Sequence, residues 1–229
     1  MMVGGVIGIG LILALMQDDP GNGRFDFRRG YQSLEGILVV DPYPVLHTFP
    51  DQDNPNGQAI ILSGPGKNGV ITHARPYDGQ RVTVGGVFIL RDDILMLQVN
   101  HRRGPLSPVT VTADQSIHHS PSPQLDPDRV RLDGEIVDGK CYAGAMRPGV
   151  RKAHMSCANL CLIGGIPPLF VTLTPNGTYD YFLLANQEGY ALSEQIYDYV
   201  SLLVSVEGII EQHGNLRVFR IDPETLSIL

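Results

Sequence analysis

The sequence predicts an all-β protein of two tandem small β-barrels, with an N-terminal transmembrane helix and a short helix inserted in the second barrel. Three observations support this fold class. Short β-branched runs alternate with turns, in keeping with 26 glycines and 17 prolines among 229 residues. A similar series of runs occurs twice along the chain. Two stretches differ: the first 16 residues are apolar, and a segment near residue 150 has helical spacing.

The composition is that of a folded protein with one large domain or two smaller ones. Hydrophobic residues make up 43% of the chain and charged residues 18%. The formal net charge is −7, and the 17 lysines and arginines form no run longer than two. Because a nucleic-acid groove needs a denser basic stripe, we expect no nucleic-acid partner.

Residues 1–17 are predicted to form a transmembrane anchor. Met1 to Met16 carries no charge, and the run stops at Gln17 and Asp18. As a helix it would be about 24 Å long, slightly short of the roughly 30 Å hydrocarbon core. A buried core helix or a signal peptide are the alternatives, but the run lacks a polar face, a preceding basic residue and a small-x-small cleavage site. We therefore expect an uncleaved anchor, with residues 1–16 in the lipid bilayer.

Two observations bear on the orientation of this anchor in the membrane, and they point in opposite directions. Arg24, Arg28 and Arg29 follow the apolar run, and a positive-inside count would place the body of the protein in the cytoplasm. Acidic residues are interleaved with these arginines, however, and large folded domains cross membranes regardless of nearby charge. We expect a single N-terminal span in the bacterial inner membrane, with the soluble domains in the periplasm.

The first barrel is predicted over residues 34–100, after a polar approach segment at 18–33. Its expected strands cover residues 36–40, 59–63, 81–90 and 94–99. A hairpin turn at Arg91-Asp92-Asp93 joins the last two. Residues 101–128 are rich in proline and serine, which indicates a linker between the two halves.

The second barrel is predicted over residues 129–229. Its expected strands cover residues 129–137, 169–173, 179–184, 200–210 and 216–221, with turns at Asn176-Gly177 and at 213–215. The segment 150–162, between the first two of these strands, is the predicted helical insertion.

An internal repeat relates the two halves. The run from Val82 to Phe88 parallels the run from Val204 to Ile210, and both follow the pattern V-x-V-x-G, apolar, turn, apolar. A glycine inside a strand relieves crowding where a sheet bends to close on itself. Five short strands and a bend glycine in each half resemble the OB-fold, a small five-stranded barrel.

All three cysteines and one histidine lie within 21 residues. The spacing C-x12-H-x2-C-x3-C is formed by Cys141, His154, Cys157 and Cys161, and a helix would place the last three on one face. Three thiols and an imidazole suit zinc, and thiolates also suit copper(I), to which Met146 or Met155 would add a thioether. The alternative is a disulfide from Cys141 to Cys157 or Cys161, with one thiol left over.

The same segment carries a family resemblance. It contains D-x-x-C at Asp138 to Cys141, H-x2-C-x3-C from His154, and G-G-x-P-P from Gly164 to Pro168. These motifs resemble small bacterial extracytoplasmic tandem OB-like proteins, as do D-P-Y-P-V-L, G-P-G-K and R-D-D-I-L-M-L in the first half. The resemblance covers most of residues 33–229. It implies two OB-like barrels outside the cytoplasm and carries no agreed activity or catalytic residue.

The prediction of function rests on the expected membrane anchor and on the lack of a recognisable catalytic set. The sequence shows no persuasive acid/base pair or nucleophile arrangement, and Gly64 to Gly69 departs from a phosphate loop and is expected to be a turn. We expect no enzyme, but an accessory subunit of a larger membrane complex, such as a photosynthetic reaction centre or a respiratory complex, with the other subunits as partners. The alternative is a zinc- or copper-binding extracytoplasmic protein, and a third interpretation is an enzyme or ligand-binding barrel.

Overall fold

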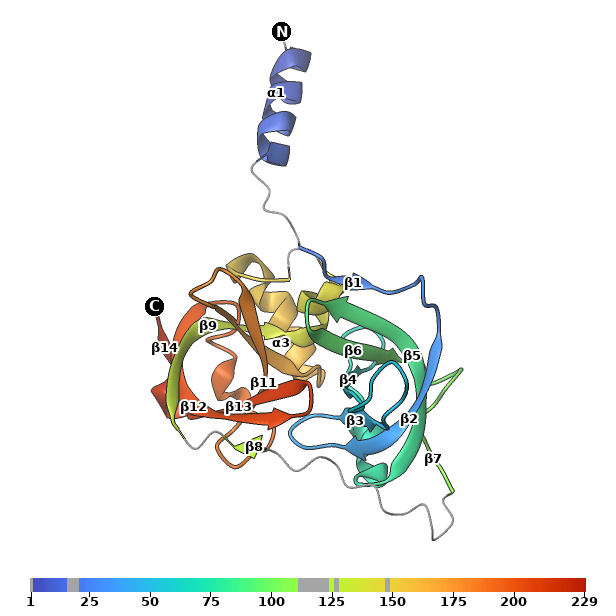
Figure 1. Cartoon of the computed structure of the whole chain (residues 1–229). Coiled ribbons are helices and arrows are strands. Elements are labelled where there is room, and N and C mark those ends of the chain that lie inside the picture. The colour runs from blue at the N-terminus through green and yellow to red at the C-terminus, as the bar shows by residue number, and fades with distance from the viewer. Residues whose placement is uncertain (1, 16–20, 111–123, 126–127, 147–148) are drawn as a thin grey trace.

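The computed structural model describes residues 2–15, 21–110, 124–125, 128–146 and 149–229. It contains two closed five-stranded barrels and an apolar helix, α1 (Met2–Leu15), that projects from them (Figure 1). The prediction of an all-β protein with two tandem small barrels is therefore confirmed.

The first barrel closes on itself in the order β2-β3-β4-β6-β5-β2. Only β4 and β6 pair in parallel, and the other pairings are antiparallel. A short helix, α2, and a 3-10 turn, η1, connect β4 to β5. The elements are β2 (Gln32–Val39), β3 (Val45–Thr48), β4 (Ala59–Ser63), α2 (Ile71–Ala74), η1 (Arg75–Tyr77), β5 (Arg81–Arg91) and β6 (Ile94–Val99).

The second barrel closes in the same way, in the order β9-β10-β11-β13-β12-β9, with β11 and β13 parallel. A helical insertion lies between β9 and β10. The barrel strands are β9 (Val130–Asp138), β10 (Pro168–Leu173), β11 (Tyr179–Ala185), β12 (Leu203–His213) and β13 (Leu216–Ile221). The helical elements are η3 (Cys141–Ala145), η4 (Lys152–His154), α3 (Met155–Ile163), η5 (Glu194–Ile196) and η6 (Pro223–Thr225).

Strand register confirms the internal repeat. Gly36 lies opposite Val82 in the first barrel, and Gly134 lies opposite Val204 in the second. A Cβ atom on Gly36 would lie 2.3 Å from the carbonyl oxygen of His47, and one on Gly134 would lie 2.4 Å from that of Val171. Both positions require glycine because a neighbouring strand approaches too closely for a side chain.

Segments outside the barrels extend the two sheets. β1 (Arg24–Phe25) belongs to the predicted approach segment and pairs with β5. β7 (Ser107–Pro108) and β8 (Gln124–Leu125) lie in the predicted linker and pair with β5 and β12. β14 (Ser227–Ile228) also pairs with β12. Residues 111–123 and 126–127 of the predicted linker lie outside the described residues.

Helix α1 has 14 residues, and residues 5–15 are largely exposed, with Val6 at 70% and Leu15 at 81%. Among the described residues, the structure contains no helix whose length and apolar character would suffice to span a bilayer.

The barrels pack against each other through a shared apolar core, which is separate from the core inside each barrel. One cluster of buried residues combines Ile61 and Met96 of the first barrel with Leu169 and Leu183 of the second. At its edge, the Asn215 side chain accepts a hydrogen bond from the Ala59 amide at 2.6 Å and donates one to the Ala59 carbonyl at 3.2 Å. Each barrel also has its own interior cluster.

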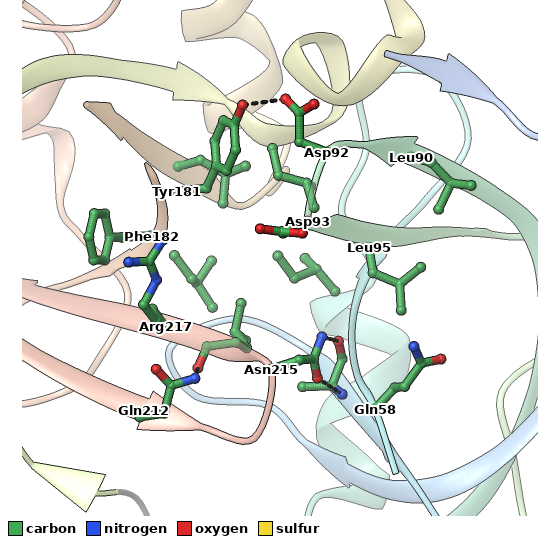
Figure 2. Close-up of a pocket in the computed structure, with 16 residues that line it drawn as sticks. Gln58, Leu90, Asp92, Asp93, Leu95, Tyr181, Phe182, Gln212, Asn215 and Arg217 are labelled. Carbon is green, nitrogen blue, oxygen red and sulfur yellow. Dashed lines mark hydrogen bonds between the residues drawn. The ribbon is translucent and has the colours of Figure 1, made fainter. Parts of the chain in front are cut away.

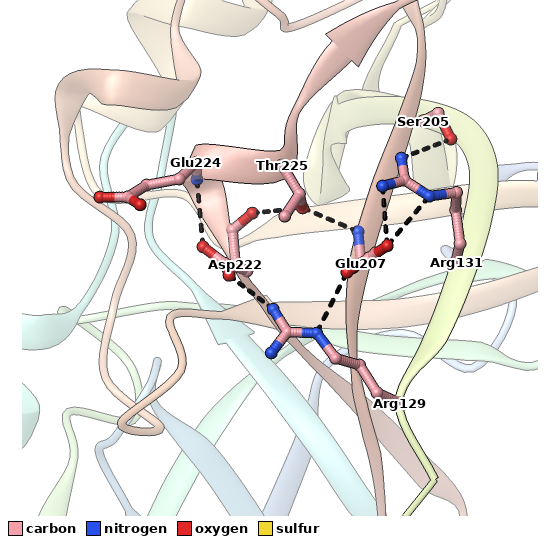
Figure 3. Close-up of polar contacts among 7 residues, drawn as sticks. All are labelled: Arg129, Arg131, Ser205, Glu207, Asp222, Glu224 and Thr225. Carbon is pink, nitrogen blue, oxygen red and sulfur yellow. Dashed lines mark hydrogen bonds and ion pairs between the residues drawn. The ribbon is translucent and has the colours of Figure 1, made fainter.

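A network of ion pairs fastens the C-terminal segment to the second barrel (Figure 3). Arg129 contacts Glu207 at 3.3 Å and Asp222 at 2.5 Å, while Arg131 contacts Glu207 at 2.8 Å. Asp222 also accepts a hydrogen bond from the Glu224 amide at the start of η6. Exposed pairs contribute little singly, so this network acts mainly to position η6 against β12.

Two histidines near the contact between the barrels, His47 and His213, lead us to expect that stability depends on pH. Burial and, to a smaller extent, the charge of His213 together lower the pKa of His47 on β3 from 6.5 to about 4. His213 in turn contacts Glu211 at 3.1 Å. Between about pH 6.5 and 4 the unfolded chain therefore binds a proton at His47 that the folded chain excludes, which favours unfolding as the pH falls.

We expect the free energy of unfolding to decrease by up to about 3 kcal/mol from this group as the pH falls from about 7 to about 4. Urea unfolding of the wild type and of His47→Gln across this range measures it, and the variant should show a shallower pH dependence. Equal pH dependence in the two proteins would contradict the role of His47.

Candidate metal centre

The cysteines lie in the connection between the first two strands of the second barrel. Strand β9 ends at Asp138, and the chain turns at once into η3, a five-residue π-helical turn that begins with Cys141. Helix α3 carries Cys157 and Cys161, and the chain then returns to β10. The predicted inserted helix is therefore present, though it begins at Met155.

The three thiols converge. The Sγ atoms of Cys141, Cys157 and Cys161 all lie within 4.8 Å of one another, and those of Cys141 and Cys161 are 3.9 Å apart. All three cysteines are free in the structure. Two sulfurs bound tetrahedrally to one zinc ion at about 2.3 Å would lie about 3.8 Å apart. The observed spacing therefore suits a shared metal ion.

A fourth sulfur lies at the edge of this cluster. The Sδ atom of Met146 is 3.8 Å from the Sγ atom of Cys157, and the Met146 side chain is 43% exposed. Cys157 is half-buried, whereas Cys141 and Cys161 are buried against Ile166. The cluster thus has a closed inner side and an open side at Cys157 and Met146, which provides an entry path for an ion.

His154 belongs to a second, overlapping group. Its Nε2 atom lies 2.9 Å from Oδ2 of Asp138, and both side chains are buried. Oδ1 of Asp138 accepts a hydrogen bond from the Cys141 amide at 2.8 Å. Asp138, Cys141 and His154 could together hold a metal ion, so the four residues expected from sequence form two groups that share Cys141. Asp138 holds the start of α3 next to the turn that carries Cys141.

Lys67 of the first barrel also reaches the thiols, and sequence reasoning did not assign it to the site. Its Nζ atom donates to Cys157 Sγ at 2.7 Å and to Cys161 Sγ at 3.5 Å. The hydrogen bond to Cys157 is the main reason that the pKa of Lys67 is raised to about 12. Lys67 lies in the G-P-G-K turn, and this motif was the only feature of the sequence that could have drawn attention to it.

The surroundings of the two buried thiols, Cys141 and Cys161, shift their pKa values in opposite directions. A hydrogen bond from Cys141, helped by the Lys67 ammonium, lowers the pKa of Cys161 to about 7 despite burial. The same hydrogen bond, together with burial, raises the pKa of Cys141. Of these two thiols, Cys161 is therefore the one that reaches the thiolate form more readily, and the thiolate is the form that binds metals and attacks electrophiles.

Two loops from different barrels hold this arrangement in place. The buried Lys140 donates to the carbonyl oxygens of Gly64 at 2.6 Å and Gly66 at 2.8 Å. The Gly69 amide donates to the Gly164 carbonyl at 2.7 Å, and a Cβ atom on Gly164 would lie 1.9 Å from the Lys67 carbonyl oxygen. The predicted turn at Gly64 to Gly69 is thus confirmed, and it serves as a contact with the second barrel.

A cleft of about 460 Å³ between the barrels is a separate feature (Figure 2). It lies beside the β5–β6 and β12–β13 hairpins, and no cysteine lines it. Tyr181 donates a hydrogen bond to Asp92, while Arg217 pairs with Asp180 at 2.8 Å. Because these polar groups already bond to neighbours, the thiol cluster is the stronger candidate site.

Comparison with known proteins found no match: no family model, no curated protein and no solved structure corresponds to the chain. The resemblance to bacterial extracytoplasmic tandem OB-like proteins stays a prediction, and the site is interpreted from its own geometry.

The contact between the loops predicts a specific loss of stability. Burial lowers the pKa of Lys140 to about 8, so its ammonium remains charged near neutral pH and donates to both carbonyls. Lys140→Met should lower the free energy of unfolding by about 1–3 kcal/mol, because the buried Gly64 carbonyl loses its charged donor.

Chemical denaturation measures this effect. Lys152→Met is the matched control, since Lys152 is exposed on the same insertion and its loss should change stability little. Equal stabilities for the two variants would contradict the role given to Lys140.

Proposed function

We propose that this protein binds a soft metal ion, copper(I), through the thiolates of Cys141, Cys157 and Cys161. The observation that carries the proposal is the convergence of three sulfurs within 4.8 Å at the junction of two barrels. A site made of thiolates binds copper(I) and zinc in preference to hard cations, which prefer oxygen ligands.

The donor set favours copper(I) over zinc. A structural zinc site needs four ligands, and the Nε2 atom of His154 is already paired with Asp138 rather than grouped with the three thiols. The additional donor nearest to Cys157 is the thioether of Met146, a ligand suited to copper(I). Zinc is the alternative occupant.

Two lysines support the binding of a monovalent ion by three thiolates. Such a complex carries a formal charge of −2 in a partly buried site, which is unfavourable without nearby positive charge. Lys67 donates directly to two of the sulfurs, and the ammonium group of Lys140 is attracted to the charges of Cys141 and Cys161. Both lysines would offset this charge when the ion is bound.

Anaerobic titration of the reduced protein with copper(I) tests the proposal. We expect one ion per chain, and Cys161→Ser should lower the affinity by at least about 100-fold, because losing a ligand costs more than altering an outer partner. His73→Ala is the control for adventitious binding, since His73 stacks on His101 and belongs to neither group of possible metal ligands. Failure to bind copper(I), or tighter binding of zinc, would contradict the assignment.

A second function is proposed from helix α1. Its apolar side chains lie largely in the open, an arrangement that is unfavourable in water and is relieved by lipid or by an apolar partner. We propose that α1 anchors the protein to the bacterial inner membrane, with the barrels in the periplasm, as a non-catalytic accessory subunit of a larger membrane complex. An electron-transfer assembly, either a photosynthetic reaction centre or a respiratory complex, is the proposed host.

Cell fractionation checks this proposal. The full chain should remain with the membrane after a high-salt wash and, after detergent extraction, elute with other subunits that mass spectrometry identifies. A variant without residues 1–20 should lose this association while keeping both barrels folded. A full-length protein that behaves as a lone soluble monomer would contradict the subunit function.

A further inference from the structure

Two of the three sulfurs, those of Cys141 and Cys161, are joined by a hydrogen bond. The Sγ atoms of Cys141 and Cys161 lie 3.9 Å apart, and one thiol donates a hydrogen bond to the other. Both residues are buried, at 6% and 1% exposure, and they pack against Ile166. Cys157 is more exposed, and its sulfur contacts Lys67 and Met146.

Helix geometry limits which cysteines can be bridged. Cys157 and Cys161 lie one turn apart on α3, where the backbone holds them in a poor geometry for a disulfide. Cys141 lies on a separate segment, η3, and approaches the helix from the end of β9. Its sulfur can therefore close on that of Cys161 by small side-chain rotations, without unwinding α3.

We propose that Cys141 and Cys161 form a reversible disulfide when a peroxide oxidises the metal-free protein, and that this bond switches off metal binding. The second half of this inference rests on the proposed function. The disulfide would consume two of the three thiolate ligands, so the oxidised protein would keep only Cys157. The site would then bind its ion only in the reduced state.

The reaction balances with hydrogen peroxide as the oxidant. The Cys161 thiolate attacks one peroxide oxygen, the O–O bond breaks, and hydroxide leaves to give a sulfenic acid. The Cys141 sulfur then attacks the Cys161 sulfur, the S–O bond breaks, and the oxygen leaves as water with the thiol proton. Solvent protonates the hydroxide, so two electrons from the thiols reduce one peroxide to two waters.

The surroundings favour Cys161 as the attacking sulfur. Lys67 places its ammonium 3.5 Å from this sulfur, where it stabilises negative charge. Cys157 contacts the same lysine, but the sulfur outside α3 that it contacts is the thioether of Met146, which cannot form a disulfide.

The test begins with metal-free wild-type protein treated with one equivalent of hydrogen peroxide, followed by alkylation of remaining thiols and non-reducing peptide mapping. We expect one bond between Cys141 and Cys161, an alkylated Cys157, and full reversal by dithiothreitol. Cys157→Ser should still form the bond, whereas Cys161→Ser should not. Copper(I) affinity should fall by more than about 100-fold on oxidation and recover on reduction.

Three results would overturn the inference: three free thiols after peroxide, a wild-type bond that includes Cys157, or unchanged copper(I) affinity after the Cys141–Cys161 bond forms. The two proposals fail separately. A bond that forms in a protein whose reduced state binds no copper(I) supports the redox pair and contradicts the metal function. Copper(I) binding without any bond supports the metal function and contradicts the redox pair.

Discussion

The thiol cluster depends on one contact, the packing of the first barrel's Gly64 to Gly69 turn against the helical insertion of the second. A buried lysine, Lys140, fixes this contact by donating to two carbonyl oxygens of the turn. Close backbone approach at Gly164 leaves no room for a side chain there. The turn in this position brings Lys67 to the sulfurs. Without that contact the cluster would lose a charged neighbour and one of its walls.

The repetition of one barrel topology in the chain explains how such a composite site is built. The two barrels share strand order and register, so neither the insertion nor the lysine turn is needed to form the fold. The insertion lies between the first and second strands of the second barrel, whereas the turn follows the third strand of the first. The two barrels therefore contribute different connections, and the candidate metal centre uses both.

The sequence predicted much of the fold, because strand pattern and turn residues are local signals. The bounds of β4, β6 and β13 match the predicted strands, but β3 was missed, since it has four residues and follows Pro42 and Pro44 closely. The predicted strand at 200–210 is displaced to 203–213, because Ser201 has a positive φ of 62° and belongs to a turn. The cysteine cluster was also visible, as it spans 21 residues. Lys67 was not assigned, because it lies 90 residues before Cys157 and no spacing rule connects them.

The lysine that crosses from one barrel to the sulfurs of the other has a thermodynamic consequence. Binding of an ion changes the charge that Lys67 faces, and separation of the barrels changes the donors around the ion. Occupancy of the proposed metal site and docking of the barrels would therefore be linked, with the same coupling free energy in both directions. If the site binds the proposed ion, a partner that separates the barrels would weaken that binding, and a bound ion would oppose the separation.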